Sequence, residues 1–323
     1  MMNIGIVGAG GIARKMAKTI NNMQEANLYA IASRTLEKAA YAAKEFDIPQ
    51  AYGSYEDMMK DDNVDLVYIA TPHSHHYEHM KLALCYNKPV LCEKAFTANA
   101  AQAREILDLS KKSGVLVAEA IWTRYLPMRT ILNEVLATGI IGEVKSLTAN
   151  LGAPISHVPR MALPSLAGGA LLDLGVYTIN FALMVLGNAF EKIEGSVIFT
   201  ETGVDAQSSV TLTYPNNVMA LLHSTQMAAT DRRGMIYGTK GYIEVQNINN
   251  PEYIRVYDID HQLIKEIEQP PQITGFEYQV RACIDAIHAK SIECPQHPHE
   301  EILRVMDIMD NVRAKWNFTY PFE

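Results

Sequence analysis

A glycine-rich turn close to the N-terminus constrains the fold of this chain more than any other feature. Gly8-Ala9-Gly10-Gly11-Ile12-Ala13 fits the pattern G-x-G-x-x-G/A and directly follows a short apolar segment. Gly8 permits a tight turn, Gly10 lets the backbone approach a pyrophosphate, and Ala13 lets the next helix pack closely on the sheet. The pattern predicts a Rossmann turn whose cofactor-binding residues are Gly8, Gly10, Gly11, Ile12 and Ala13.

The first 121 residues alternate short apolar segments with longer segments of helical period. The apolar segments cover residues 3–7, 28–32, 66–70, 89–92 and 116–118. Ser54, with Asp57 three residues later, has the spacing of a helix cap. This alternation is typical of a doubly wound parallel sheet covered by helices.

The pattern changes after Trp122. Helices are expected over residues 127–137, 169–186, 275–289 and 299–315. Between them lie β-rich segments at 144–150, 193–200, 206–214, 218–226, 234–237, 242–246 and 253–257. The predicted fold class is α/β, with a Rossmann domain over residues 1–121 and an α+β domain over residues 122–323. The second domain would hold a large, mainly antiparallel open sheet and share a cleft with the first near residues 119–125.

Composition limits the classes of partner. The chain has 28 Lys and Arg against 36 Asp and Glu, a net charge of −8, so no global positive field would attract nucleic acid. We expect no membrane segment, since neither a secretory leader nor an 18-residue apolar run is evident, and a cytoplasmic protein follows. The four cysteines lack the spacing of a disulfide framework, which predicts reduced, mostly packed thiols.

The end of the second strand indicates which dinucleotide is bound. It reads Ala32-Ser33-Arg34-Thr35, without the acidic residue that usually meets the ribose 2′-hydroxyl of NAD. Ser33, Arg34 and Thr35 suit a 2′-phosphate, because a guanidinium can bind phosphate oxygens in a bidentate manner. NADP is the preferred cofactor. The alternative is that Arg34 is a solvated charge and that either NADP or NAD is used.

Four further motifs resemble one family of oxidoreductases. They are Ala70-Thr71-Pro72-His73 with His76, Val90-Leu91-Cys92-Glu93-Lys94, Glu119 to Tyr125, and Gly168 to Tyr177. Together with the glycine turn they resemble the glucose-fructose oxidoreductase, inositol dehydrogenase and rhizopine-catabolism (Gfo/Idh/MocA) family. The similarity is greatest to its branch of dimeric dihydrodiol dehydrogenases and NADP-linked xylose dehydrogenases, and it spans nearly the whole chain.

The resemblance implies roles for individual residues. Lys94 would reach the nicotinamide and the reacting hydroxyl, and Tyr177 would transfer the proton. Thr71, Pro72, His73, His76 and Glu93 would line the cofactor groove. Trp122, Arg124, His157 and Arg160 would flank the substrate, the last two from a loop bounded by Pro154 and Pro164. Alternatives are that Tyr177 is a core tyrosine and that Trp122 only packs between domains with Arg124 at the surface.

The spacing of three polar residues supports a substrate site on the long apolar helix. Asp173 and Tyr177 are four residues apart and Asn180 follows three later, so one helix face can present all three. Asp173 and Asn180 would bind sugar hydroxyls, and Gly168 and Gly169 would leave room for the substrate.

The chain departs from the family pattern at two positions. The family's Glu-Lys-Pro reads Glu93-Lys94-Ala95, so the backbone loses the fixed φ of proline. Asn180 stands where many relatives carry Asp, and much of the family has His at the position of Tyr177. These departures affect loop precision and substrate choice rather than reaction type.

The sequence predicts an NAD(P)-dependent dehydrogenase or reductase acting on a hydroxyl or carbonyl of a sugar, polyol or trans-dihydrodiol. The alternative from another class is a regulatory protein that binds NADP without turnover.

A metal site at His73, His75, His76 and His79 is disfavoured, because no carboxylate completes a ligand set. The resemblance implies a homodimer or homotetramer through the second-domain sheet. Val210, Leu212 and Tyr214 would line one face of that sheet, although such a face can equally cover its own helices.

Overall fold

The computed structural model describes all 323 residues, which divide into two compact units. Unit 1 comprises Met1–Tyr125 and Gln272–Leu303, and unit 2 comprises Leu126–Pro271 and Arg304–Glu323. The division differs from the expected single boundary after residue 121, because residues 272–303 return to unit 1. Each unit is described separately below.

Unit 1 is built on a six-stranded sheet in which all neighbouring strands are parallel. The strands are β1 (Met2–Val7), β2 (Ala26–Ala32), β3 (Gln50–Tyr52), β4 (Leu66–Ile69), β5 (Val90–Glu93) and β6 (Val117–Ala120). Their order is β3-β2-β1-β4-β5-β6. The doubly wound sheet expected from the sequence is therefore confirmed, and the three-residue β3 is an addition to the five apolar segments.

Helices connect the strands of unit 1. They are α1 (Gly11–Ile20), α2 (Leu36–Phe46), α3 (Tyr55–Met59), α4 (His73–Cys85) and α5 (Ala100–Ser113), with the one-turn helix η1 (Trp122–Arg124) after β6. Ser54 caps α3 by accepting a hydrogen bond from the Asp57 N–H at 3.2 Å, as its spacing predicted. The chain order reverses between β1 and β4, so the loops after β1, β4 and β5 lie at one edge of the sheet, where Rossmann folds bind their ligands.

Residues 272–303 join unit 1 through buried contacts of α9 (Glu277–His288). Val280 and Cys283 of this helix are buried in the core that also contains Ile4 and Ile6 of β1. Arg281 forms an ion pair with Glu25 immediately before β2. A boundary drawn along the sequence could not show this return, since the helix lies more than 140 residues after the rest of its unit.

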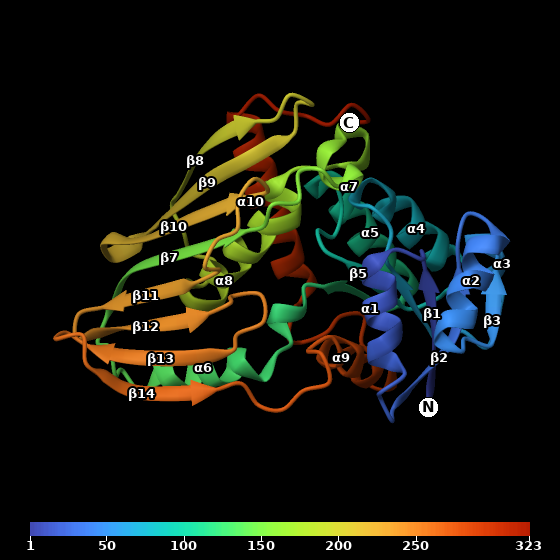
Figure 1. The fold of residues 1–323 in the computed structure, drawn as a ribbon, viewed down its shortest axis with the longest axis horizontal. Helices are drawn as coiled ribbons and strands as arrows, with labels where there is room; N and C mark the ends of the chain where they lie inside the picture. Colours follow the sequence, from blue (N-terminus) through green and yellow to red (C-terminus); the bar gives the residue numbers. More distant parts are fainter. The chain divides into compact units, whose positions relative to one another are not determined.

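Unit 2 contains an eight-stranded sheet of order β14-β13-β12-β11-β7-β10-β9-β8, shown in Figure 1. All neighbours are antiparallel except β7 and β10. The strands are β7 (Val144–Gly152), β8 (Lys192–Phe199), β9 (Asp205–Tyr214), β10 (Val218–Thr225), β11 (Gly234–Gly238), β12 (Gly241–Gln246), β13 (Tyr253–Asp258) and β14 (Leu263–Glu268). The large, mainly antiparallel sheet is confirmed, and β14 is the one strand that the sequence did not predict.

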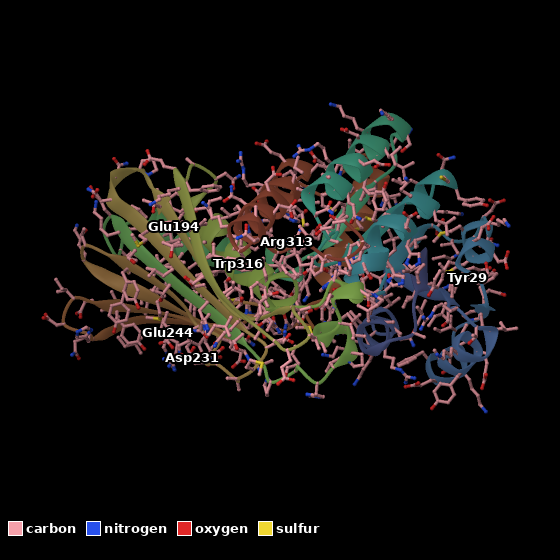
Figure 2. The ribbon with its side chains drawn as sticks, turned by 90° about the horizontal axis from the view of Figure 1, so that it is seen from above. Tyr29, Glu194, Asp231, Glu244, Arg313 and Trp316 are labelled. Carbon is pink, nitrogen blue, oxygen red and sulfur yellow. The ribbon has the colours of Figure 1, made fainter.

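One face of this sheet is packed against a helix of its own unit. The helices of unit 2 are α6 (Pro127–Ala137), α7 (Pro159–Ala162), α8 (Val176–Leu186) and the part of α10 (His299–Lys315) from Arg304 onward, with short turns η2 (Pro164–Leu166) and η4 (Pro215–Asn217). α8 packs against β7 and β10. A Cβ on Gly234 would lie 2.3 Å from the ring of Phe181, so this glycine permits α8 to approach β11. Arg313 lies in the last turn of α10 and Trp316 directly follows this helix (Figure 2), where Trp316 lies close to Gly195 of β8.

The two faces of the sheet differ in exposure. On β10, Ala220 and Leu222 are buried, whereas the alternate residues Met219 and Leu221 are 41% and 45% exposed. Val210, Leu212 and Tyr214 belong to the buried face, so they close over their own unit rather than line an exposed surface. The exposed face is marked by the side chains of other residues, among them Met219, Leu221 and Tyr237.

The segment Pro164–Leu186 is long and apolar enough to cross a membrane by length and composition, but 83% of its most apolar window is buried inside the protein. Such burial is that of a core helix. All four cysteines are free thiols; Cys92, Cys283 and Cys294 are buried and Cys85 is exposed.

Candidate active site

The glycine turn has the geometry that a dinucleotide requires. Gly8 follows β1 with φ of +104°, and a Cβ there would lie 2.9 Å from the carbonyl oxygen of Ala70 at the end of β4. The Gly8 N–H donates to the Ala32 carbonyl at 2.9 Å. Only glycine therefore fits at this position, where the chain leaves β1 close to the ends of its neighbours β2 and β4.

The N-terminus of α1 is open to an anion. Gly10 precedes the first turn without a side-chain cap, no acidic residue occurs in that turn, and a Cβ on Gly10 or Gly11 would meet no atom within 4 Å. Unpaired N–H groups and the helix dipole then face a space large enough for phosphate oxygens. Ala13 is 1% exposed and packs in the core, while Ile12 is half-buried. The residues of this turn fit a bound pyrophosphate.

The end of β2 divides its three predicted residues between structural and exposed positions. Ser33 is buried and its N–H donates to the Tyr52 carbonyl at 3.1 Å. Thr35 caps α2 by accepting from the Lys38 N–H at 3.4 Å. Arg34 is exposed, and its charge acts on the neighbouring rings of Tyr55 and His75. It is therefore the residue of the three whose side chain is available to a 2′-phosphate.

Two rings that the sequence did not connect with Arg34 lie within its electrostatic reach. Burial raises the pKa of Tyr55, and the Arg34 charge opposes that shift. Burial and then the Arg34 charge lower the pKa of His75. The Tyr55 ring contacts His79 edge-on at 4.6 Å between centroids. These rings therefore lie near Arg34, between the end of β2 and α4.

His76 has a structural role that differs from the predicted contact with the cofactor. Its ring is fully buried, with Nδ1 2.9 Å from the Ala95 carbonyl oxygen and Nε2 2.8 Å from that of Thr71. Burial lowers the pKa of His76 to about 4. The ring thus links the loop after β4 to the loop after β5, and a side chain without exposed surface cannot line a groove.

The other residues of the loop after β4 lie close to the predicted groove. Pro72 precedes the first turn of α4, and the Thr71 hydroxyl contacts His79 Nδ1 at 3.0 Å. His73 is 6% exposed and meets His76 edge-on. No three His, Cys, Asp or Glu side chains in the chain come together as a metal site, so the four neighbouring histidines do not form one.

Lys94 follows the last residue of β5 at the same sheet edge as the glycine turn. β5 pairs with β4, which pairs with β1, so the three loops are adjacent. The Lys94 side chain is half-buried, and the peptide bond that joins it to Ala95 is cis. Glu93 is buried and accepts a hydrogen bond from the Tyr68 hydroxyl. Glu93 therefore anchors the strand end, and Lys94 is the residue of the pair with exposed surface.

A buried carboxylate that the sequence did not single out as functional lies beside this loop. Glu119 of β6 accepts from the Phe96 N–H at 2.9 Å through Oε1, and its Oε2 lies 2.8 Å from His297 Nε2. Burial raises the pKa of Glu119 to about 8. Its partner His297 occurs in the returning segment, more than 170 residues away, which is why spacing alone did not connect them.

Trp122 and Arg124 are both committed to contacts within unit 1. The Trp122 ring stacks on Phe276 at 4.1 Å between centroids. Arg124 is 1% exposed and pairs with Glu301. Arg124 is therefore neither a surface residue nor accessible to a substrate, because its guanidinium is buried against that carboxylate. Its role is to hold η1 to the start of α10.

The helix that carries Asp173 and Tyr177 is not a single regular α-helix. Leu171–Gly175 forms a π-helical turn (η3), and α8 begins at Val176. A π turn has more than four residues, so a spacing of four keeps Asp173 and Tyr177 near one face. Both side chains are mostly buried, 5% and 7% exposed. Single π turns of this kind often mark functional sites.

Arg160 reaches Asp173 from the Pro-bounded loop. Its Nη1 donates to Asp173 Oδ1 at 2.8 Å, and the arginine side chain is 45% exposed. The loop residue and the helix residue that the sequence predicted separately are thus brought together. His157 of the same loop is exposed.

Asn180 is placed differently from the prediction that it binds sugar hydroxyls. It is fully buried, and its amide Nδ2 donates to the Val176 carbonyl one turn earlier at 2.7 Å. Of the three polar residues predicted on one helix face, Asp173 and Tyr177 therefore remain candidates for substrate contact, and Asn180 supports the helix backbone.

The two glycines before η3 accommodate the protein rather than a substrate. A Cβ on Gly168 would lie 2.4 Å from the Met161 carbonyl oxygen, and one on Gly169 would lie 1.9 Å from Asp205 Oδ1. Asp205 accepts from the Leu171 N–H at 2.6 Å and so caps the π turn. The expectation that these glycines make room for the substrate is corrected: the space holds the capping carboxylate.

Two family models match the chain. The model described as "Oxidoreductase family, NAD-binding Rossmann fold" matches residues 2–121, and the "GFO/IDH/MocA C-terminal domain" matches residues 130–244. The chain belongs to the GFO/IDH/MocA family. It is an oxidoreductase with an NAD(P)-binding Rossmann domain, as the motifs at Gly8 and Lys94 indicated.

Relatives within the family cover nearly the full chain. The trans-1,2-dihydrobenzene-1,2-diol dehydrogenase of Mus musculus is 35% identical over 98% of this chain and 97% of its own length. The enzyme of the same name from Xenopus laevis is 38% identical over 98% of each. The structure of KijD10, a 3-ketoreductase from Actinomadura kijaniata with NADP and TDP-benzene, has a TM-score of 0.89 and 25% identity over 97% of each chain. The structure of levoglucosan dehydrogenase, with a TM-score of 0.84 and 18% identity over 97% of each chain, shares the fold.

Capping by Asp205 predicts a pH-dependent stability. Burial raises the pKa of Asp205 from 3.8 to about 7, so the folded protein retains a proton that the unfolded chain releases. The stability from this proton is complete below pH 3.8 and is lost as the pH rises to about 7. Compared with Asp205→Asn, the wild type should lose up to about 1.4 kcal/mol of unfolding free energy per pH unit in this window. Urea denaturation of both proteins across the window measures the difference, and parallel profiles would contradict it.

Proposed function

We propose that the protein transfers a hydride between NADP(H) and a CH–OH or carbonyl group of a sugar, polyol or trans-dihydrodiol. The position of Lys94 is the observation that carries the proposal. It is half-buried at the end of β5, at the same sheet edge as the open N-terminus of α1. The match over 98% of the chain to dehydrogenases of a cyclic diol supports the substrate class.

The chemistry assigns separate tasks to the cofactor and to the chain. The bound nicotinamide accepts or donates the hydride. Lys94 then serves the oxygen bonded to the carbon that gives up or receives the hydride, because an ammonium that donates a hydrogen bond stabilises negative charge on that oxygen.

Tyr177 is proposed as the acid or base of the reaction. Oxidation of an alcohol releases a proton as well as a hydride, so one titratable group must contact the hydroxyl. A phenol has an ordinary pKa near 10, and an ammonium close to it would favour the phenolate. Asp173, held by Arg160, would accept a hydrogen bond from a neighbouring hydroxyl of the diol and orient it.

Loss of either group should reduce turnover without loss of the cofactor. We expect Lys94→Met and Tyr177→Phe each to lower kcat by about 10²- to 10⁴-fold, the usual contribution of a general acid or base. The assay follows NADP reduction at 340 nm over aldoses, polyols, inositols and trans-dihydrodiols at mildly alkaline pH. NADP affinity, measured by calorimetry, should change little.

Two outcomes of this screen would overturn the proposal. Wild-type protein that binds NADP tightly but turns over no substrate in either direction would indicate a regulatory protein. A Tyr177→Phe variant that retains most of the wild-type kcat would show that another group transfers the proton.

Arg34 is proposed to select NADP over NAD. Removal of a charge-assisted hydrogen bond to the 2′-phosphate should raise the KM for NADP by about 10- to 100-fold in Arg34→Gln and leave that for NAD nearly unchanged. Arg281→Gln is the matched control, because it removes the same charge beside the opposite end of β2. Equal KM values for the two cofactors in the wild-type enzyme would contradict the assignment.

We further propose that two copies associate through the exposed face of the eight-stranded sheet. Leu221, Thr148 and Met235 lie in register on adjacent strands β10, β7 and β11, and Leu221 is 45% exposed. An exposed sheet face that carries apolar side chains is the kind of surface that partners bury.

A charge on this face should dissociate the assembly. We expect wild-type protein to sediment as a dimer or larger oligomer and Leu221→Glu to sediment as a monomer at micromolar concentration. Ile259→Glu, at a position 70% exposed between β13 and β14, is the control and should leave the mass unchanged. A monomeric wild type, or an unchanged mass for Leu221→Glu, would exclude this interface.

A further inference from the structure

The peptide group that joins Ala95 to Phe96 is bound on both of its sides by buried side chains. Its carbonyl oxygen lies 2.9 Å from His76 Nδ1, and its N–H donates to Glu119 Oε1 at 2.9 Å. His76 and Glu119 are 0% and 1% exposed. Because both polar atoms of one peptide plane are held, that plane cannot rotate without breaking a buried hydrogen bond.

Glu119 is itself held in place by two further hydrogen-bonding contacts. Its second carboxylate oxygen lies 2.8 Å from His297 Nε2, and its own backbone carbonyl accepts from the Tyr125 hydroxyl at 2.9 Å. His297 is fully buried in a turn where its backbone pairs with that of Cys294 in an isolated antiparallel β-bridge. The acceptor for the Phe96 N–H is therefore fixed by both β6 and the returning segment.

His76 fixes the other side of the peptide plane through α4. Its second ring nitrogen lies 2.8 Å from the carbonyl oxygen of Thr71, in the loop after β4. A neutral imidazole carries one N–H, so His76 donates to one of these two carbonyls and packs against the other. His76 thus places the loop after β5 beside the loop after β4, and Glu119 ties the loop after β5 to β6.

We propose that His76 and Glu119, the latter held by His297, are positioning residues that set the direction in which Lys94 leaves the backbone. The inference rests on the proposed role of Lys94. The lysine side chain is long and has several rotatable bonds, so it samples a wide region. The direction of the Cα–Cβ bond, which the backbone sets, decides which region the amine can reach. This chain has Ala95 where the family motif has proline, and alanine leaves φ free to vary. The hydrogen bonds to the next peptide group supply the missing constraint.

Loss of the hydrogen bonds from His76 or Glu119 is expected to lower turnover rather than cofactor affinity. Neither positioning side chain has surface for a ligand, and the phosphate-binding turn is on another loop. A displacement of a catalytic group by about 1 Å can reduce the rate about 100-fold. We therefore expect loss of either hydrogen bond to reduce kcat while the dissociation constant for NADP stays nearly constant.

Substitutions at Glu119 test the proposal. Glu119→Leu removes the acceptor for the Phe96 N–H and should lower kcat about 10- to 100-fold, with the NADP dissociation constant within about threefold of wild type. Glu119→Gln keeps an acceptor oxygen and should recover most of kcat. His76→Leu breaks the opposite side of the same peptide group and provides a second, independent variant if Glu119→Leu fails to fold.

A matched control separates positioning from general stability. Lys88 is also buried in unit 1 and bound to backbone, donating to the carbonyls of Asp61 and Val64 at 2.7 and 3.1 Å. Lys88→Met should lower thermal stability without changing kcat. If Lys88→Met and Glu119→Leu reduce kcat equally, the effect of Glu119 is on folding and the proposal fails.

A second substitution restores the constraint by another route. Proline at position 95 fixes φ of that residue, so Ala95→Pro should raise the kcat of Glu119→Leu at least about fivefold and change that of the wild type by less than twofold. Identical effects in both backgrounds would contradict the proposal. Failure of the proposed function is distinct from this outcome, because it would appear as a Lys94→Met variant that retains wild-type turnover.

Discussion

Parallel pairing of β1 with β4 and of β4 with β5 is the constraint on which the candidate site depends. It brings three loops to one edge of the sheet: the glycine turn, the loop at Thr71 and the loop at Lys94. The glycine turn and Lys94 are separated by more than 80 residues in sequence, so no local preference could bring them together. The turn binds an anion through backbone N–H groups, and the position of the amine relative to it follows from strand register.

The loops at this edge are held by buried polar groups rather than by their own backbone preferences. Buried polar atoms require partners, and here the partners belong to other loops: His76 between Thr71 and Ala95, and Glu119 between Phe96 and His297. Asp205 has the corresponding role in unit 2, where it caps the π turn that precedes Tyr177. Both carboxylates have raised pKa values because burial disfavours their charged form. In each unit the residue proposed for chemistry is close to a buried group that fixes its backbone.

The sequence predicted the fold wherever local pattern determines structure. Glycine spacing, apolar alternation and helix caps identified both sheets and nearly all of their strands. The exceptions have physical causes: β3 has only three residues, and β14 carries Lys265, Glu266 and Glu268 on a largely exposed edge strand. The return of residues 272–303 to unit 1 depends on tertiary packing of α9, which no single segment encodes.

Residue types at the site were predicted better than their surroundings. The roles of Lys94 and Tyr177 were implied by the family resemblance, whereas Asp173 and Arg34 were chosen for spacing and chemistry. The structure places Asp173 beside Arg160 and leaves Arg34 exposed. Arg124 and His76 were assigned to ligands by the family resemblance and Asn180 by its spacing on the helix, but each is buried and bonded within its own unit. A sequence shows that a polar group is present and leaves open whether its partner is a ligand or the protein itself.

Transfer of isotope tests the central claim most directly. The wild-type enzyme would be incubated with NADP and a trans-dihydrodiol or sugar identified as a substrate, carrying deuterium on the carbinol carbon. Hydride transfer predicts one deuterium per turnover on C4 of the nicotinamide, on one face only, and none in the Lys94→Met variant at equal time. Oxidised product accompanied by unlabelled NADPH, with deuterium released to water, would contradict direct hydride transfer and with it the function proposed for this site.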